Sequence, residues 1–285
     1  MSIRSIKRVA KAKATMEGAG VHLSRAFGFG DPKELDPFLL FDDFRNDEPK
    51  HYRKGFPFHP HRGIETITYV LRGSVEHQDS LGNEGVLEAG DVQWMTSGRG
   101  IIHQEMPTGD ENGHMYGFQL WANLPAKHKL TKPRYQEYKA EQIPTLDEQG
   151  ASVRVISGSY MGTTGPVKGI AANPTYLDIT LPAKAGKSIR VDRKAHAFAY
   201  VFEGSGQFGE AAHAEEAADR TLVVFGDGDE VVVHAGPEGI RFLLVSGEPL
   251  REPVAWRGPI VMNTDEELAQ AFRELQEGTF LEGGD

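Results

Sequence analysis

The stretch "FPFHPHRGIETITYVLRGS", residues 56–74, places two histidines directly before a run rich in β-branched and aromatic residues. The run from Thr66 to Leu71 is typical of a β-strand. Residues two apart on a strand project from the same face, with Cα atoms roughly 6.6 Å apart. His59 and His61 can therefore direct two imidazoles at one metal ion, and the remaining ligands must come from elsewhere in the chain.

A second pair with the same spacing follows in "GRGIIHQEMP", residues 98–107, where His103 and Glu105 are also two apart. Three imidazoles and one carboxylate suit divalent iron, nickel, cobalt, manganese or zinc. Calcium and magnesium prefer shells made of oxygen alone. The two pairs together predict a transition-metal site. The other histidines considered, namely His77, His114, His128, His196 and His234, are interpreted as surface or hydrogen-bonded residues.

Glu65 is an alternative source of the carboxylate. It lies four residues after His61, so a continuous strand would place both on one face. Glu65 could replace Glu105 as a ligand, or it could hydrogen-bond to a ligand histidine. A bend expected at Arg62-Gly63 leaves its direction open.

The composition narrows the classes of function. The chain has 285 residues, no cysteine and a formal net charge of −10, which excludes disulfides, thiolate metal sites and cysteine nucleophiles. Nucleic-acid binders usually carry a basic domain or stripe. Here the basic residues gather near the start, at Arg4, Lys7, Arg8, Lys11 and Lys13, which we interpret as a solvated edge. No signal-peptide or membrane-span pattern occurs. We therefore expect a cytoplasmic protein that binds neither membrane nor nucleic acid directly.

Short strand-like runs separated by Gly, Asn and Asp turns predict an all-β protein. The clearest runs are Thr66–Leu71, Val92–Met95, Gly117–Leu124, Thr175–Leu181, Ala197–Phe202, Thr221–Phe225 and Ile240–Val245. The segment 130–150 is interpreted as the connection between two halves. Near the C-terminus, Thr264 and Glu267 have capping-box spacing, and an apolar stripe of Leu268, Phe272 and Leu275 predicts a packing helix that stops at Gly278.

The two halves of the chain repeat a short pattern. "TYVLRGS" (68–74) is similar to "AYVFEGS" (199–205), and each is followed by a Gly-Asp step, at Gly90-Asp91 and at Gly228-Asp229. Two matches at a nearly constant offset indicate a duplicated β unit.

Several longer segments resemble the pirin family of the cupin superfamily. They are "HPHRGIET", "GDVQWMTSGRGIIHQEMP", "FQLWANLP", "DPFLLFDDF" (36–44) and "GEPLREPVAWRGPIVMNTDEE" (247–267). The resemblance implies two cupin barrels (double-stranded β-helix or jelly-roll) and a short C-terminal helix. We expect a metal-binding N-terminal cupin domain at 1–135 and a metal-free C-terminal cupin domain, with the helix, at 136–285.

The resemblance also implies the metal ligands. The ligand positions of the pirin family correspond to His59, His61, His103 and Glu105 in this sequence. The resemblance therefore favours Glu105 over Glu65 as the carboxylate ligand. We expect one divalent transition metal per chain, with Fe(II) first and nickel, cobalt, manganese or zinc as alternatives. Aligning Tyr69 with Tyr200 places Arg190 opposite His59 and Asp192 opposite His61, and no HxE pattern follows Gly228-Asp229. The second half therefore lacks the ligands.

The resemblance to pirins implies two possible functions. Some open flavonols such as quercetin with O2, and for that reaction Glu105 is the candidate catalytic base. Others are metal- or redox-dependent regulatory proteins that bind a transcription factor or modulate a metabolic enzyme. The enzymatic hypothesis is our first expectation and a regulatory protein partner is the alternative. Under the enzymatic hypothesis, the planar substrate could be flanked by Trp94, Phe56 and Phe58. Alternatively, these three side chains pack in the core.

Overall fold

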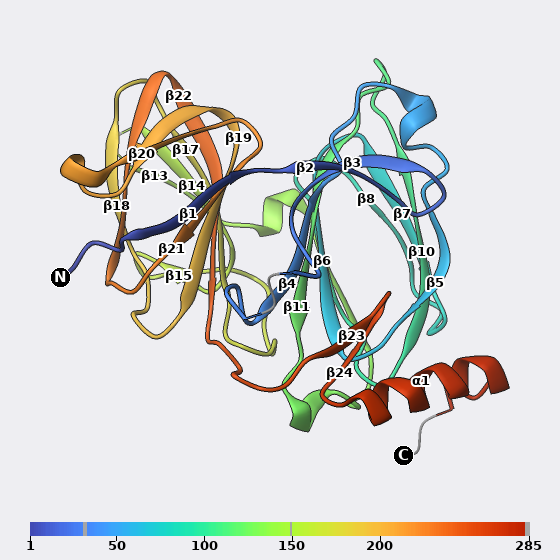
Figure 1. Cartoon of the computed structure of the whole chain (residues 1–285). Helices are drawn as coiled ribbons and strands as arrows, with labels where there is room; N and C mark the ends of the chain where they lie inside the picture. Colours follow the sequence, from blue (N-terminus) through green and yellow to red (C-terminus); the bar gives the residue numbers. More distant parts are fainter. Residues whose placement is uncertain (31–32, 149, 283–285) are drawn as a thin grey trace. The chain divides into compact units, whose positions relative to one another are not determined.

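The computed structural model describes residues 1–30, 33–148 and 150–282. The chain forms two compact units (Figure 1). We call the unit made of Ala14–Pro32, Phe38–Ala140 and Leu250–Asp285 the first barrel. The unit made of Met1–Lys13, Lys33–Pro37 and Glu141–Pro249 is the second barrel. Strands dominate both, which confirms the all-β prediction.

The wall of the first barrel consists of two sheets. Its strands are β2 (Lys13–Glu17), β3 (Val21–Phe27), β4 (Phe38–Asp43), β5 (Phe56–His61), β6 (Ile64–Arg72), β7 (Ser74–Asp79), β8 (Glu84–Leu87), β9 (Val92–Thr96), β10 (Ile101–Thr108), β11 (Tyr116–Asn123) and β12 (Arg134–Tyr138). Seven strands pair in the order β12-β9-β6-β11-β4-β3-β2, and four pair as β5-β10-β7-β8. A β23–β24 hairpin (Ala255–Arg257 and Ile260–Met262), helix α1 (Asp265–Glu277) and two 3-10 turns (Pro49–His51 and Ala126–His128) complete the unit.

The second barrel is built mainly from one sheet. Its strands are β1 (Ile6–Lys11), β13 (Thr145–Glu148), β14 (Ala151–Ser157), β15 (Ser159–Tyr160), β16 (Thr163–Thr164), β17 (Thr175–Leu181), β18 (Gly186–Arg190), β19 (His196–Phe208), β20 (Glu215–Ala218), β21 (Thr221–Phe225) and β22 (Glu230–Gly247). The 3-10 turn Ala211–His213 lies between β19 and β20, and another, Ala140–Gln142, precedes β13. All seven strand runs expected from the sequence are present.

Sheet order confirms the duplication. The series β1-β21-β19-β22-β17-β14-β13 follows the same plan as β12-β9-β6-β11-β4-β3-β2, so β19 holds the position of β6. These two strands carry the repeated sequence. The Gly-Asp part of the repeat is not equivalent, because Gly90-Asp91 precedes β9 whereas Gly228-Asp229 follows β21, the counterpart of β9.

The two ends of the chain do not follow the expected boundaries 1–135 and 136–285. The N-terminal residues belong to the second barrel, and the C-terminal residues belong to the first. The N-terminal strand β1 pairs with β21 of the second barrel, as β12 pairs with β9 of the first. The C-terminal segment joins the first barrel, where α1 contacts β23 and β24 (Figure 1). The repeated sequence lies within 68–91 and 199–229, so it does not indicate which barrel either chain end joins.

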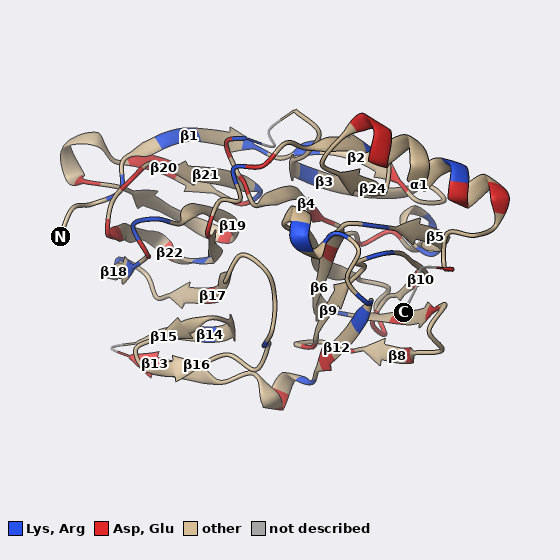
Figure 2. Cartoon of the chain, turned by 90° about the horizontal axis from the view of Figure 1, so that it is seen from below, with Lys and Arg blue, Asp and Glu red and all other residues tan. Residues whose placement is uncertain are grey.

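Helix α1 forms as predicted. Thr264 and Glu267 make a complete capping box, and Gly278 ends the helix in the left-handed conformation with φ 77°. Acidic residues occupy the first turn (Figure 2), where they complement the helix dipole. Leu268 packs in a small apolar cluster with β24 residues, and Phe272 and Leu275 pack against that cluster. Within the described residues, no helix is long and apolar enough to cross a membrane.

The segment 130–150 connects the two halves as expected, because the chain passes from the first barrel to the second between Ala140 and Glu141. It also contributes β12 to the first barrel and β13 to the second.

The basic N-terminal cluster is only partly the solvated edge that we expected. Lys7, Lys11 and Lys13 are exposed, but Arg4 is not. Arg4 is 2% exposed, and its guanidinium donates hydrogen bonds to the carbonyls of Asp192, Ala195 and Gly226. Arg4 therefore secures the N-terminal segment within the second barrel.

Candidate metal centre

Three histidines converge inside the first barrel. His59 and His61 lie on β5, and β10 pairs with β5 so that His103 is directly opposite His59. One ring nitrogen from each residue lies within 4.8 Å of the others. Among the described residues, this is the one group of three or more His, Asp or Glu side chains placed to hold an ion.

Backbone carbonyls orient two of the imidazoles. The Nδ1 atom of His59 lies 2.9 Å from the Pro57 carbonyl oxygen, and Nδ1 of His61 lies 3.1 Å from that of Pro259. A carbonyl only accepts, so each Nδ1 carries the proton and each Nε2 presents a lone pair. The two Nε2 atoms are 3.1 Å apart. Two nitrogens bound at about 2.1 Å and near a right angle to one metal would be about 3 Å apart, which fits this spacing.

His103 gives the strongest indication that this group of side chains binds an ion. Its side chain is 0% exposed, and neither ring nitrogen has a hydrogen-bond partner within the described part of the chain. An unsatisfied buried polar atom costs roughly 1–3 kcal/mol. Burial, followed by the neighbouring imidazoles of His59, His61 and His77, lowers the pKa of His103 well below its usual value. The ring is therefore neutral, which is the form that binds metal, so these residues fit a transition metal.

His61 behaves like His103. It is 1% exposed, and burial followed by the charge of His59 lowers its pKa well below the usual value. His77 is different, because its Nε2 lies 3.2 Å from Asp79 Oδ2 and its ring stacks on Tyr135. The interpretation of His77 as a hydrogen-bonded residue is therefore confirmed. Its ring centroid is 5.4 Å from that of His103.

The Glu105 carboxylate is buried close by but lies outside the histidine group. Its Oε1 accepts a hydrogen bond of 2.8 Å from the Thr68 hydroxyl, and its Oε2 accepts one of 2.7 Å from the Gln119 amide. These donors fix the carboxylate on the inner face of β6 and β11. The role of Glu105 as fourth ligand therefore remains a prediction.

Glu65 points away from this face. Thr68 projects toward Glu105, and strand alternation places Glu65, three residues earlier on β6, on the opposite face. Its Oε1 accepts a 2.8 Å hydrogen bond from Thr96 on β9. Glu105 is thus the better candidate for the carboxylate ligand.

Replacing each glutamate by glutamine tests this ranking. We expect Glu105→Gln to weaken metal binding by roughly 100-fold, because an anionic donor is lost, and Glu65→Gln to change it less than roughly 10-fold. Metal affinity is measured by competition with a chromophoric chelator, and unfolding midpoints check that both variants are folded. Stronger metal loss in Glu65→Gln than in Glu105→Gln would transfer the ligand role to Glu65.

A mainly apolar pocket of about 430 Å³ opens onto His59 and His61. Its walls include Leu40, Phe56 and Trp121. The Trp121 ring is 5.0 Å from the His61 ring in an edge-on arrangement. This volume is within the range of small-molecule sites, about 300–1,000 Å³. The pocket can therefore hold a planar organic ligand beside the candidate metal ligands.

The expected aromatic residues separate into different roles. Phe56 lines the pocket, Trp94 is fully buried, and Phe58 is 58% exposed. Gln119 and Trp121 were not foreseen, although their i, i+2 spacing in "FQLWANLP" places them on one strand face. Trp121 Nε1 donates to Gln119 Oε1 over 3.0 Å, so the indole orients the amide that holds Glu105.

The C-terminal segment completes the pocket in a way the sequence did not indicate. Gly258 and Pro259 line it, and the Pro259 carbonyl orients His61. The buried Lys129 ammonium donates to the carbonyls of Gly63 and Val261, at 2.8 and 2.9 Å. It thereby joins the turn after β5 to strand β24.

The second barrel fills the equivalent interior with apolar side chains. The aligned residue Arg190 is exposed, so the expected match of Arg190 and Asp192 with the ligand histidines is wrong. Ile189 is fully buried and pairs with the fully buried Val231, as His59 pairs with His103. Val191 is buried in the same core. The loop before β19 has one extra residue, which shifts the alignment by one position and reverses the strand face.

Comparison with known proteins agrees with the duplicated sheets and the histidine site. The pirin model matches residues 20–122, and the model for the pirin C-terminal cupin domain matches residues 176–281. The chain belongs to the pirin family. The predicted pair of cupin barrels is thus confirmed.

Two relatives and one solved structure illustrate the similarity. A pirin-like protein of Caulobacter vibrioides is 44% identical over 98% of this chain and 100% of its own length. A Pseudomonas aeruginosa pirin relative, provisionally named a quercetin 2,3-dioxygenase, is 42% identical over 92% of this chain and 93% of its own. A crystal structure of quercetin 2,3-dioxygenase from Acinetobacter baumannii superposes with a TM-score of 0.88 at 30% identity, covering 98% and 99% of the two chains.

Proposed function

We propose that this pirin is a metal-dependent dioxygenase that opens a flavonol such as quercetin with O2. One observation carries the proposal: three histidines converge beside an apolar pocket lined by aromatic residues, and both ring nitrogens of the buried His103 lack a partner among the described residues. The names of the Pseudomonas relative and the Acinetobacter structure support the substrate class.

His59, His61 and His103 would hold the metal, with Glu105 as the fourth ligand. Fe(II) is our first expectation, and nickel, cobalt, manganese or zinc are alternatives. When bound, such a metal lowers the pKa of a coordinated hydroxyl and so favours the flavonol anion.

The remaining roles follow from the side chains around the pocket. The Trp121 and Phe56 rings would confine the planar substrate next to His59 and His61. Glu105 would accept the proton of the flavonol 3-hydroxyl. Gln119 and Thr68, whose hydrogen bonds fix the carboxylate, would keep Glu105 oriented for this transfer. The apolar walls would limit access of water to the anion.

Anaerobic titration with quercetin tests the proposal. Metal-loaded protein should shift the flavonol absorption band toward that of the anion, and admitting O2 should then bleach the band and release carbon monoxide. Protein loaded in turn with iron, nickel, cobalt and manganese should be compared. If none of these forms binds a flavonol or consumes O2, the metal-dependent regulatory protein becomes the better interpretation.

A further inference from the structure

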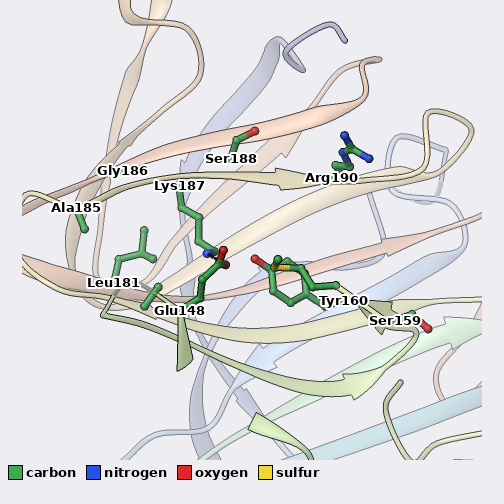
Figure 3. A pocket seen from close by; sticks show the side chains of 11 residues that line it. Glu148, Ser159, Tyr160, Leu181, Ala185, Gly186, Lys187, Ser188 and Arg190 are labelled. Atoms are coloured by element: carbon green, nitrogen blue, oxygen red, sulfur yellow. Dashed lines mark hydrogen bonds and ion pairs between the residues drawn. The ribbon is translucent and has the colours of Figure 1, made fainter. Parts of the chain in front are cut away.

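The second barrel has a cavity of its own, with a volume of about 600 Å³ (Figure 3). It is larger than the pocket at the histidines, and its size is again typical of small-molecule sites. The proposed flavonol chemistry uses no residue of this barrel. The cavity therefore calls for a separate explanation.

The position of the cavity follows from the duplication. Lys187 lines it from β18 and lies two residues before Ile189, the buried residue that stands where His59 stands in the first barrel. Pro57 has the same relation to His59 and lines the histidine pocket. Residues two apart share a strand face. The second barrel therefore has a cavity at the position that corresponds to the histidine pocket, and the interior next to it is apolar. We call this cavity the mouth of the second barrel.

A mostly covered cation, the Lys187 ammonium, faces this cavity. The Lys187 side chain is 11% exposed, and its Nζ lies 2.7 Å from Oε2 of Glu148, which is 38% exposed. Figure 3 shows the two side chains pointing toward one another beside the Tyr160 ring. Burial lowers the pKa of Lys187, but hydrogen bonds with Glu148 and Tyr160 raise it above the usual value overall. Lys187 is therefore a fixed charge, whereas Glu148 can turn toward water.

The lining favours an anion with an apolar body. Lys187 and Arg190 are the positive residues of the lining and Glu148 is the negative one. The Glu230 carboxylate lies opposite Arg190 on β22 and accepts a 2.7 Å hydrogen bond from the lining residue Ser188, so Lys187, whose ion-pair partner is Glu148, is the cation that an incoming anion can reach. Among the described residues, the Arg190 guanidinium makes no ion pair. Tyr160 and Leu181 supply apolar surface. These features suit a carboxylate attached to a ring.

We propose that the mouth of the second barrel binds a small aromatic carboxylate, whose charged group replaces Glu148 on the Lys187 ammonium. The ring would lie against Tyr160 and Leu181, and Arg190 at the rim would attract the anion. Glu148 would occupy Lys187 when no ligand is bound, so the two carboxylates compete for one cation.

Competition predicts opposite effects for two substitutions. Benzoate binding to metal-loaded protein is measured by calorimetry, with benzyl alcohol as the uncharged probe. Lys187→Met should weaken benzoate binding at least tenfold, because a charge-assisted hydrogen bond is lost in a mostly buried site. Glu148→Gln should tighten it several-fold, because the competing anion is gone. A merely structural role for the ion pair would not give opposite signs.

Arg193→Gln serves as the matched control, since it removes one positive charge from an exposed side chain of the same barrel outside the cavity lining. It should leave benzoate binding within twofold of wild type. Near-UV circular dichroism verifies that each variant is folded. The proposal is overturned if benzyl alcohol binds as tightly as benzoate, if Lys187→Met binds benzoate like wild type, or if Glu148→Gln weakens binding.

Discussion

Replacing His103 by alanine is expected to remove the metal and to abolish flavonol binding. The wild-type protein should hold about one equivalent of transition metal per chain, with His59, His61 and His103 as its nitrogen ligands. Loss of His103 removes one of the three nitrogen ligands and leaves a cavity that alanine cannot fill, so metal affinity should fall more than about 100-fold even if Glu105 still binds. Elemental analysis after dialysis measures the bound metal, and quercetin titration without O2 measures the flavonol site.

His77→Ala is the control for packing. His77 is as buried as His103 and lies next to it, but it is hydrogen-bonded to Asp79 and is not one of the three converging residues. Both variants should lose comparable stability, roughly 2–5 kcal/mol, because each leaves a cavity in the same barrel. The His77 variant alone should keep its metal. Full metal content in His103→Ala would contradict the ligand assignment.

Gly63→Ala should destabilise the first barrel as strongly as the loss of a buried histidine does, although it adds only one methyl group. Gly63 has φ +78°, a conformation that costs an alanine roughly 1–2 kcal/mol. An added Cβ would also overlap the carbonyl oxygen of Val261, which must then move. Such overpacking typically costs a further 1–3 kcal/mol, so the total is about 2–5 kcal/mol.

The same change should weaken metal binding. Displacing Val261 moves strand β24, and the preceding Pro259 carbonyl orients the His61 ring. A loss of roughly 10- to 100-fold in metal affinity is expected, as for other groups that orient metal ligands. Urea unfolding and chelator competition measure the two effects separately.

Gly82→Ala separates backbone strain from steric overlap. Gly82 has φ +84°, and no heavy atom of the described residues lies within 4 Å of the position of its added Cβ. This variant should therefore lose only the roughly 1–2 kcal/mol of conformational strain and keep its metal affinity. Equal losses in the two variants would show that the Val261 contact does not matter.

Much of the fold follows from local patterns. Alternating strand runs, the capping box at Thr264 and the stop at Gly278 depend on neighbouring residues only, and all of them appear as expected. The repeated segment on β6 and β19 indicated the duplication for the same reason. The ligand pair His59 and His61 is also local, because strand geometry alone places both on one face.

The sequence by itself thus determined the strands, the duplication and the three histidines that the barrel brings together. Only the tertiary structure decided which barrel each chain end joins. The local sequences of β1 and α1 predict a strand and a helix, but they do not say against which barrel these elements pack. Only the tertiary structure decided the face of Glu65, the inward residues of the second barrel and the role of Pro259. Each of these depends on strand register or on contacts between residues far apart in the chain, and a shift of one residue reverses a strand's face without changing its local pattern.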